Sequence, residues 1–151
     1  MAKVTVQSIP DHSYALLIND GSHAFVSDES AEDGGDDLGP EPYELLLGAL
    51  GACTAMTVLM YARRKQWPLY EVSVHLTHDR VYAHDLEQHA DPDIPRADLA
   101  GKIELITRDI SVRGELSDEQ AARLLEIADR CPVHRTLQSA PRVVSTIVTG
   151  R

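Results

Sequence analysis

The sequence has few cysteines and none of the short motifs that mark the commonest catalytic sites. Only Cys53 and Cys131 occur among its 151 residues. The chain has no glycine-rich phosphate loop, no GxSxG nucleophile elbow and no CxxC pair. It therefore lacks the signatures of P-loop nucleotide binding, α/β-hydrolase chemistry and thioredoxin-like redox chemistry. Two isolated thiols remain as candidates for chemistry.

The sequence also lacks a secretory signal and is poor in basic residues. Its first ten residues, MAKVTVQSIP, are typical of a strand, so we expect a cytoplasmic protein with reduced thiols. Lysine and arginine number 14 against 24 acidic residues, a net charge of -10 that argues against nucleic acid or an anionic membrane as partner. Much of the excess lies in 28–41, the acidic loop, which we expect to be solvated.

The longest apolar stretch runs from Pro42 to Lys65 and predicts one buried helix. It opens on a proline and closes on three basic residues, the order that a helix dipole favours. Its length would also span a membrane, but its many small and polar residues favour a core helix. Gly48, Ala52 and Ala55 share one ridge, where we expect a neighbouring element to approach closely.

The rest of the chain predicts strands, a second helix and two long loops within one domain, 1–151. We expect strands at 3–8, 14–19, 22–27, 70–77, 103–112 and 142–149, with a bulge or bend at Arg108. A polar, proline-bearing loop fills 84–101. The order of elements predicts an α+β domain with a mainly antiparallel sheet around two core helices.

The second helix leads directly to Cys131. Ser117 and Gln120 form a capping box at its start, and the apolar stripe that follows extends to Cys131 on the core side. Pro132 ends this helix and allows a short new one to begin at 133–138.

The two thiols have different local surroundings. Arg130, His134 and Arg135 flank Cys131, and an N-cap position there would also lower its pKa. The apolar neighbours of Cys53 would raise its pKa unless a cation reaches it from elsewhere in the fold. The residues alone leave two interpretations open: a reactive pair that meets in space, or two small buried hydrophobic side chains.

The histidines do not predict a metal site. His75, His78, His84 and His89 are spread over a strand and a loop, and Cys131 with His134 is a single pair. Zinc requires about four ligands in compact pairs, so we expect no metal and no cofactor.

Four segments, in this order and spacing, resemble the OsmC/Ohr family: GPEPYELLLGALGACTAM, VHLTHDRVYAHD, RDISVRGELS and IADRCPVHRTL. The resemblance implies an intertwined homodimer with two central helices wrapped by sheet. It also implies a thiol peroxidase for organic hydroperoxides, with Cys53 as the peroxidatic and Cys131 as the resolving thiol. A dithiol would reduce the resulting disulfide, without a metal or an organic cofactor.

The chain departs from the family pattern at two positions. No arginine precedes Arg63, whereas the family's peroxidases supply one from the N-terminal part, so Arg80 or Arg135 are the candidate cations. The family's glutamate falls at Tyr43, with Glu44 one residue later.

Glu44 and Cys53 are about 13 Å apart along one helix and lie on opposite faces, so Glu44 would assist the thiol only from a partner chain. Four apolar side chains could form a pocket for the peroxide: Leu46, Leu50, Met56 and Met60. The alternative function is a small-molecule binding or detoxifying protein of the same family with little peroxidase activity.

Overall fold

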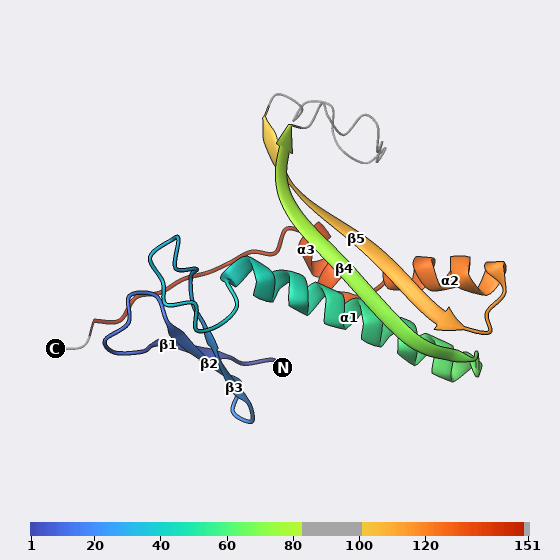
Figure 1. The fold of residues 1–151 in the computed structure, drawn as a ribbon, viewed down its shortest axis with the longest axis horizontal. Helices are drawn as coiled ribbons and strands as arrows, with labels where there is room; N and C mark the ends of the chain where they lie inside the picture. The colour runs from blue at the N-terminus through green and yellow to red at the C-terminus, as the bar shows by residue number, and fades with distance from the viewer. Residues whose placement is uncertain (83–100, 150–151) are drawn as a thin grey trace. The chain divides into compact units, whose positions relative to one another are not determined.

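The computed structural model describes residues 1–82 and 101–149 of an α+β protein with antiparallel sheets, which confirms the predicted fold class. The chain forms two compact units, Met1–Gly48 and Ala49–Arg151 (Figure 1). The polar loop expected at 84–101 lies almost wholly outside the described residues. The strands form two separate sheets, one of three strands and one of two.

The first unit contains a three-stranded meander. Strands β1 (Thr5–Ser8), β2 (Leu16–Asn19) and β3 (Ala24–Ser27) pair antiparallel in this order. The Asp20 carboxylate accepts the backbone N–H groups of Ser22 and His23 at 2.8 and 2.7 Å. Gly21 supplies the positive φ of 95° that the turn needs. The predicted hairpin turn is therefore confirmed.

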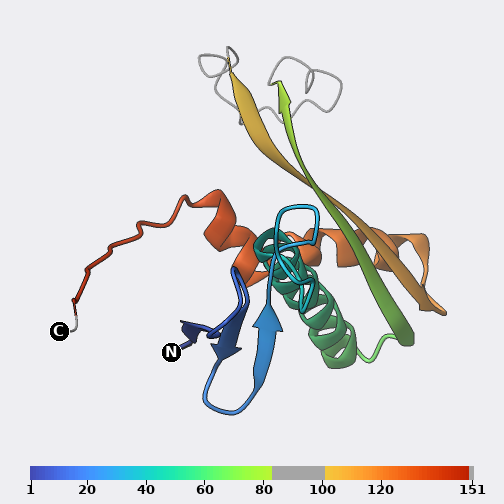
Figure 2. The same cartoon turned by 60° about the vertical axis from the view of Figure 1, so that its left-hand side comes forward.

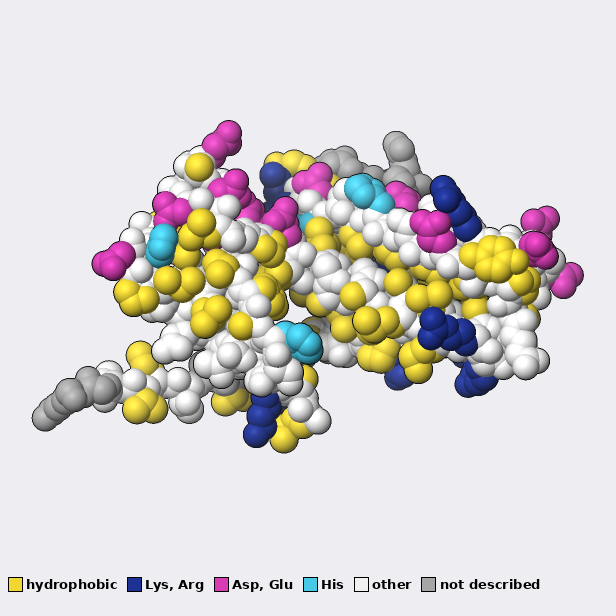
Figure 3. Space-filling view, turned by 60° about the horizontal axis from the view of Figure 1, so that its bottom comes forward, with side chains coloured by type: hydrophobic (Ala, Val, Ile, Leu, Met, Phe, Trp, Pro, Cys, Tyr) yellow, Lys and Arg dark blue, Asp and Glu magenta, His cyan; other side chains and the backbone are white. Residues whose placement is uncertain are grey.

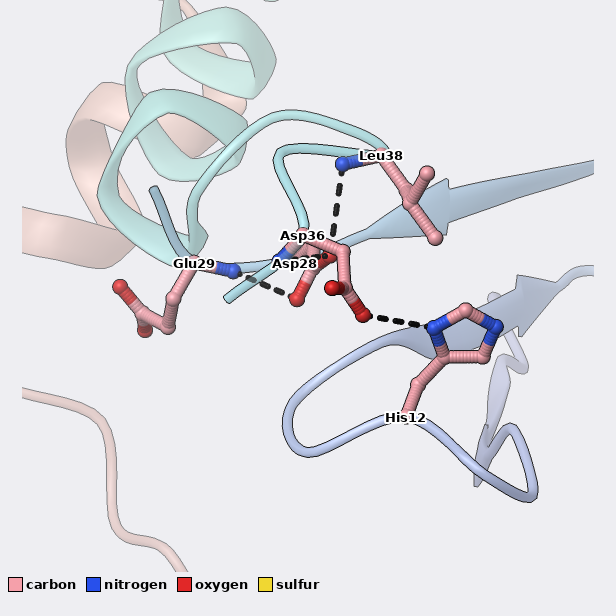
Figure 4. Close-up of polar contacts among 5 residues, drawn as sticks. All are labelled: His12, Asp28, Glu29, Asp36 and Leu38. Carbon is pink, nitrogen blue, oxygen red and sulfur yellow. Dashed lines mark hydrogen bonds and ion pairs between the residues drawn. The ribbon is translucent and has the colours of Figure 1, made fainter. Parts of the chain in front are cut away.

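The acidic loop is mostly exposed, as expected, but its first carboxylate, Asp28, is buried. Asp28 is buried and accepts the backbone N–H groups of Glu29, Asp36 and Leu38 at 2.9, 3.1 and 3.3 Å. His12 Nδ1 lies 2.7 Å from Asp36 Oδ2 (Figure 4). Because three donors converge on one side chain, this carboxylate fixes the path of the loop.

Helix α1 spans Pro42–Lys65, as the sequence predicted. Its buried positions recur along one stripe, namely Leu50, Gly51, Thr54, Val58 and Ala62. A Cβ added at Gly51 would lie 2.9 Å from Leu76 Cδ1, so the close approach occurs here. The expected ridge was wrong, because Gly48 has no such neighbour and Ala52 is exposed.

Helix α1 is not covered on all sides within one chain. Only 28% of its most apolar 18-residue window is buried. Among the described residues it is the one helix long and apolar enough to cross a membrane, a test that core helices of soluble proteins also pass. Its buried stripe packs on α2 and on the second sheet, as expected of a core helix.

The second sheet is a long hairpin of β4 (Leu69–Tyr82) and β5 (Lys102–Gly114), which run side by side in Figures 1 and 2. Its register is regular from Glu71 paired with Arg113 to Tyr82 paired with Lys102. The irregularity lies between Leu69 and Glu71, so the bulge expected at Arg108 was wrong.

Two further helices complete the second unit. Helix α2 (Asp118–Ala128) begins with the predicted capping box, and α3 (Pro132–Gln138) follows it closely. The core consists of residues from α1 and α2, namely Val58, Ala62, Leu124 and Ala128. Apolar side chains of β4 and β5, including Val72, Ile110 and Val112, pack against it.

The C-terminal segment, 142–149, forms no strand, contrary to the prediction. Figure 2 shows the chain leaving α3 without a strand arrow, and the segment pairs with neither of the two sheets. Four of its side chains are 86–92% exposed: Val143, Val144, Ile147 and Val148. A strand requires a neighbouring backbone to bond with, and the described part of the chain offers none to this segment.

Leu124 and Leu125 provide a matched test of the core. Leu124 is 2% exposed and Leu125 is 58% exposed on the same helix. Leu124→Ala should lower the free energy of unfolding by about 2–5 kcal/mol, because it leaves a cavity. Leu125→Ala should change it by no more than about 0.5 kcal/mol. Urea denaturation of both variants measures this, and equal losses would contradict the assigned core.

Asp28 should make the stability depend on pH. Burial raises the pKa of this carboxyl, but the backbone donors and the charge of His12 outweigh burial and lower the pKa below its usual value. Its contribution to stability is therefore complete above about pH 4 and is lost as the pH falls through the lower, folded-state pKa.

Asp28→Asn should accordingly lower the melting temperature at pH 7, and this loss should shrink towards pH 3. Glu32→Gln, which removes a charge from an exposed side chain of the same loop, is the control and should have little effect. Melting curves from pH 3 to 7 measure both. A loss for Asp28→Asn that stays constant with pH would refute the assignment.

Candidate functional site

The structure brings the two cysteines together as a pair of free thiols. Cys53 lies half-buried on α1, and Cys131 lies fully buried before α3. Each side chain shifts the pKa of the other, so the two thiols lie close enough to interact. Two sulfurs from distant parts of the chain therefore form one site, which we call the thiol pair.

Local sequence explains the position of Cys131. The apolar stripe of α2 carries the chain inward, and Pro132 occupies the first turn of α3, where its missing N–H is not needed. Cys131 adopts an extended conformation, with φ -61° and ψ 137°, and caps α3. Its Sγ accepts the backbone N–H of His134 at 3.3 Å.

A buried hydroxyl and an arginine extend the site. Thr54 is 0% exposed, and its Oγ1 lies 3.8 Å from Cys131 Sγ, to which it donates. The same Oγ1 accepts from Arg108 Nη1 at 3.0 Å. Arg108 Nη2 donates to Asp129 Oδ1 at 2.6 Å. A continuous chain of hydrogen bonds therefore joins Asp129 to the Cys131 sulfur.

The pKa values of the two thiols shift in opposite directions. Burial raises the pKa of Cys131, but hydrogen bonds from the His134 N–H, the Cys53 thiol and Thr54 outweigh burial and lower it below the usual value. Burial raises the pKa of Cys53, and the neighbouring Cys131 raises this pKa further. In the reduced pair, Cys131 is therefore the more acidic thiol and Cys53 the proton donor.

Sequence reasoning missed Arg108, although a signal was present. Arg108 precedes Ile110 and Val112 at intervals of two residues, so all three share one face of β5. Ile110 and Val112 pack against the core. A charged residue in line with a core-facing apolar pattern requires a buried partner, and this marks it as a site residue.

The two arginines proposed from the sequence lie elsewhere. Arg80 Nε lies 3.4 Å from Glu104 Oε1 on the β4–β5 hairpin, and Arg135 is exposed on α3. Glu44 Oε2 accepts the backbone N–H of Glu41 at 3.0 Å, a bond that caps the first turn of α1. Among the described residues, Arg108 is the cation that hydrogen bonds connect to the thiol pair, through Thr54.

The expected pocket residues differ in exposure. Leu50 is buried and Leu46 is half-buried, whereas Met56 and Met60 are exposed. The methionines do not line an enclosed cavity in a single chain. A substrate bound at this face of α1 would be enclosed only if a further surface covered it.

The described histidines are not gathered into a metal site. His78 Nε2 lies 2.7 Å from Glu104 Oε2, while His84 and His89 lie outside the described residues. In the acidic loop, carboxylate oxygens of Glu29, Asp33 and Glu41 lie within 4.8 Å of one another. Such exposed acidic groups are common without a metal, so this cluster supports no assignment.

The fold and the site define an α+β protein with a pair of free thiols, one buried and one half-buried, and similar proteins give its family. The family model described as OsmC-like protein matches residues 34–146. The chain belongs to the OsmC-like family. No curated protein matches the sequence.

Solved structures support the same fold at low sequence identity. An OsmC-like protein from Mycoplasma pneumoniae matches with a TM-score of 0.67 and 19% identity over 91% of this chain and 87% of that one. The organic hydroperoxide resistance protein OsmC from Legionella pneumophila matches with a TM-score of 0.61 and 16% identity over 91% and 90%. The organic hydroperoxide resistance protein OhrB of Bacillus subtilis matches at 0.57 and 18% over 91% and 90%.

Proposed function

We propose that this protein is a thiol peroxidase that reduces organic hydroperoxides with Cys53 and Cys131 as its redox pair. The observation that carries the proposal is that the fold brings the two free thiols close together, where each shifts the pKa of the other. Membership of the OsmC-like family supports it, since relatives of the same fold are described as organic hydroperoxide resistance proteins.

Cys53 is the sulfur that attacks the peroxide. It is half-buried, whereas Cys131 is fully buried, so a hydroperoxide reaches Cys53 first. Its proton moves to the Cys131 thiolate, and the Cys53 thiolate then attacks one peroxide oxygen. The O–O bond breaks, Cys53 becomes a sulfenic acid, and the alkoxide takes up the proton to leave as an alcohol.

Cys131 completes the oxidative half of the cycle. Its thiolate attacks the sulfenic sulfur of Cys53, the S–O bond breaks, and hydroxide leaves as the disulfide forms. The peroxide has then accepted two electrons from the two thiols. A dithiol reductant returns the pair to the reduced state by thiol exchange.

One observation favours a second function, a small-molecule binding or detoxifying protein with little peroxidase activity. The raised pKa of Cys53 lowers the fraction of reactive thiolate at neutral pH. In the peroxidase, Cys131 must therefore serve as the base for Cys53. In the binding protein, the pair stays reduced in the presence of peroxide.

Single-cysteine variants separate these functions. With an organic hydroperoxide, Cys131→Ser protein should accumulate a sulfenic acid on Cys53 that dimedone traps, because the resolving thiol is missing. Cys53→Ser protein should react slowly, because its remaining thiol is buried. Mass spectrometry locates the adduct, and hydrogen peroxide in place of the organic peroxide tests the substrate class.

Free cysteine is the reference rate in this experiment. A sulfenic acid on Cys131 in the Cys53→Ser variant would reverse the two roles. Oxidation of the unmodified chain by an organic hydroperoxide no faster than that of free cysteine would reject the peroxidase and favour the binding protein.

We also propose that the functional form is a homodimer. Met56 and Met60 are 62% and 71% exposed, and the apolar side chains of the C-terminal segment are exposed as well. Figure 3 shows apolar side chains (yellow) at the surface of one face. A second chain would cover such surface, and would bring a Glu44 from outside the helix that carries Cys53.

Light scattering at micromolar concentration should therefore give twice the mass of one chain. Ile147→Asp should shift the protein towards monomer, because it places a charge in the apolar C-terminal segment. Thr149→Asp, which replaces a polar side chain two positions later, is the control. A monomer of the unmodified chain at this concentration would rule out the dimer.

A further inference from the structure

Arg108 is a charged side chain on the core-facing side of β5. Its side chain is 11% exposed, and both terminal nitrogens are engaged, with Thr54 Oγ1 at 3.0 Å and Asp129 Oδ1 at 2.6 Å. An arginine in this setting is held in one geometry by its two partners. The proposed peroxidase cycle assigns it no task.

Which group donates and which accepts in each hydrogen bond determines how Arg108 affects the thiol pair. A guanidinium group has donors and no acceptor, so Thr54 Oγ1 must accept from Arg108. The hydroxyl proton of Thr54 is then directed to Cys131 Sγ at 3.8 Å. The His134 N–H donates to the same sulfur at 3.3 Å. Negative charge is therefore stabilised on Cys131.

The two sulfurs also differ in access. Cys131 is fully buried and Cys53 is half-buried. In thiol–disulfide exchange a reductant attacks one sulfur, and the other leaves as a thiolate; the better-stabilised thiolate leaves faster. Access and charge stabilisation therefore favour the same direction of attack.

We propose that Arg108, acting through the Thr54 hydroxyl, is a positioning residue that makes Cys131 the leaving sulfur when a dithiol reopens the Cys53–Cys131 disulfide. The inference rests on the disulfide of the proposed function. A reductant thiolate attacks Cys53 Sγ and forms a mixed disulfide, the Cys53–Cys131 bond breaks, and its electron pair goes to Cys131. The second thiol of the reductant then attacks the reductant's own sulfur in the mixed disulfide. This releases the Cys53 thiolate, and the reductant leaves as its disulfide.

Other charged or titratable groups face Cys131 from each neighbouring element. Cys53 lies on α1, Arg108 on β5, Asp129 at the end of α2, and His134 on α3. Arg130, which precedes Cys131, is exposed. Arg108 acts through a buried hydroxyl, so substitution of Thr54 tests its effect without changing any charge.

Trapping of the mixed disulfide tests the direction of attack. The full chain is oxidised with diamide, which forms the disulfide without a peroxide. It is then treated with the monothiol 2-mercaptoethanol, quenched in acid and mapped by mass spectrometry. The adduct should lie on Cys53. An adduct mainly on Cys131, or failure of diamide to form the disulfide, would overturn the proposal.

Substitutions test the role of the hydrogen-bond chain. Thr54→Val and Arg108→Met should slow reduction of the disulfide by dithiothreitol about three- to tenfold, the effect of about one lost hydrogen bond. Thr54→Ser keeps the hydroxyl and should reduce at the wild-type rate. Arg113→Met is the matched control, because Arg113 lies on the same strand with its side chain 81% exposed.

A pH titration excludes a merely structural effect. In reduced protein with ¹³C-labelled cysteine, the Cβ shift of Cys131 reports its ionisation. Its midpoint should move to higher pH in Thr54→Val and Arg108→Met, and should stay in place in Thr54→Ser and Arg113→Met. Unchanged midpoints and rates in both test variants would overturn the proposal. If diamide-oxidised protein behaves as described but organic hydroperoxides do not oxidise the pair, the peroxidase fails and this inference stands.

Discussion

The site depends on a buried hydroxyl held between an arginine and a sulfur. Thr54 is fully buried, so its hydroxyl requires partners, and it finds Arg108 on one side and Cys131 on the other. Arg108 is nearly buried and requires an acceptor for each end of its guanidinium group, which Thr54 and Asp129 supply. No element meets these requirements alone, so α1, β5 and the end of α2 are fixed relative to one another.

This arrangement explains why the two neighbouring thiols differ in acidity. Donors converge on Cys131 and lower its pKa, whereas burial and the neighbouring Cys131 raise the pKa of Cys53. The accessible sulfur is therefore the proton donor and the buried sulfur carries the charge. This difference in acidity suits the proposed cycle. Cys53 attacks the peroxide and is later attacked by the reductant, while Cys131 serves as base, resolving thiol and leaving group.

The apolar surface of the second unit has a consequence for assembly. Helix α1 buries one stripe against α2 and the β4–β5 hairpin, while Met56 and Met60 remain exposed. The C-terminal segment has the composition of a strand but no partner among the described residues. Both features suit a fold that is completed by a second chain, in keeping with the proposed homodimer.

The sequence by itself determined the features that depend on near neighbours. Helix α1 begins at Pro42 and ends after its basic residues, and Ser117 with Gln120 caps α2, because caps and breakers act within a few residues. Tertiary structure alone decided that Arg108 reaches Thr54 and that the bulge falls at the start of β4 rather than at Arg108. The lower pKa of Cys131 followed in part from its local N-cap position, where the His134 N–H donates to its sulfur, whereas the donor that Thr54 adds from α1 is brought there only by tertiary structure.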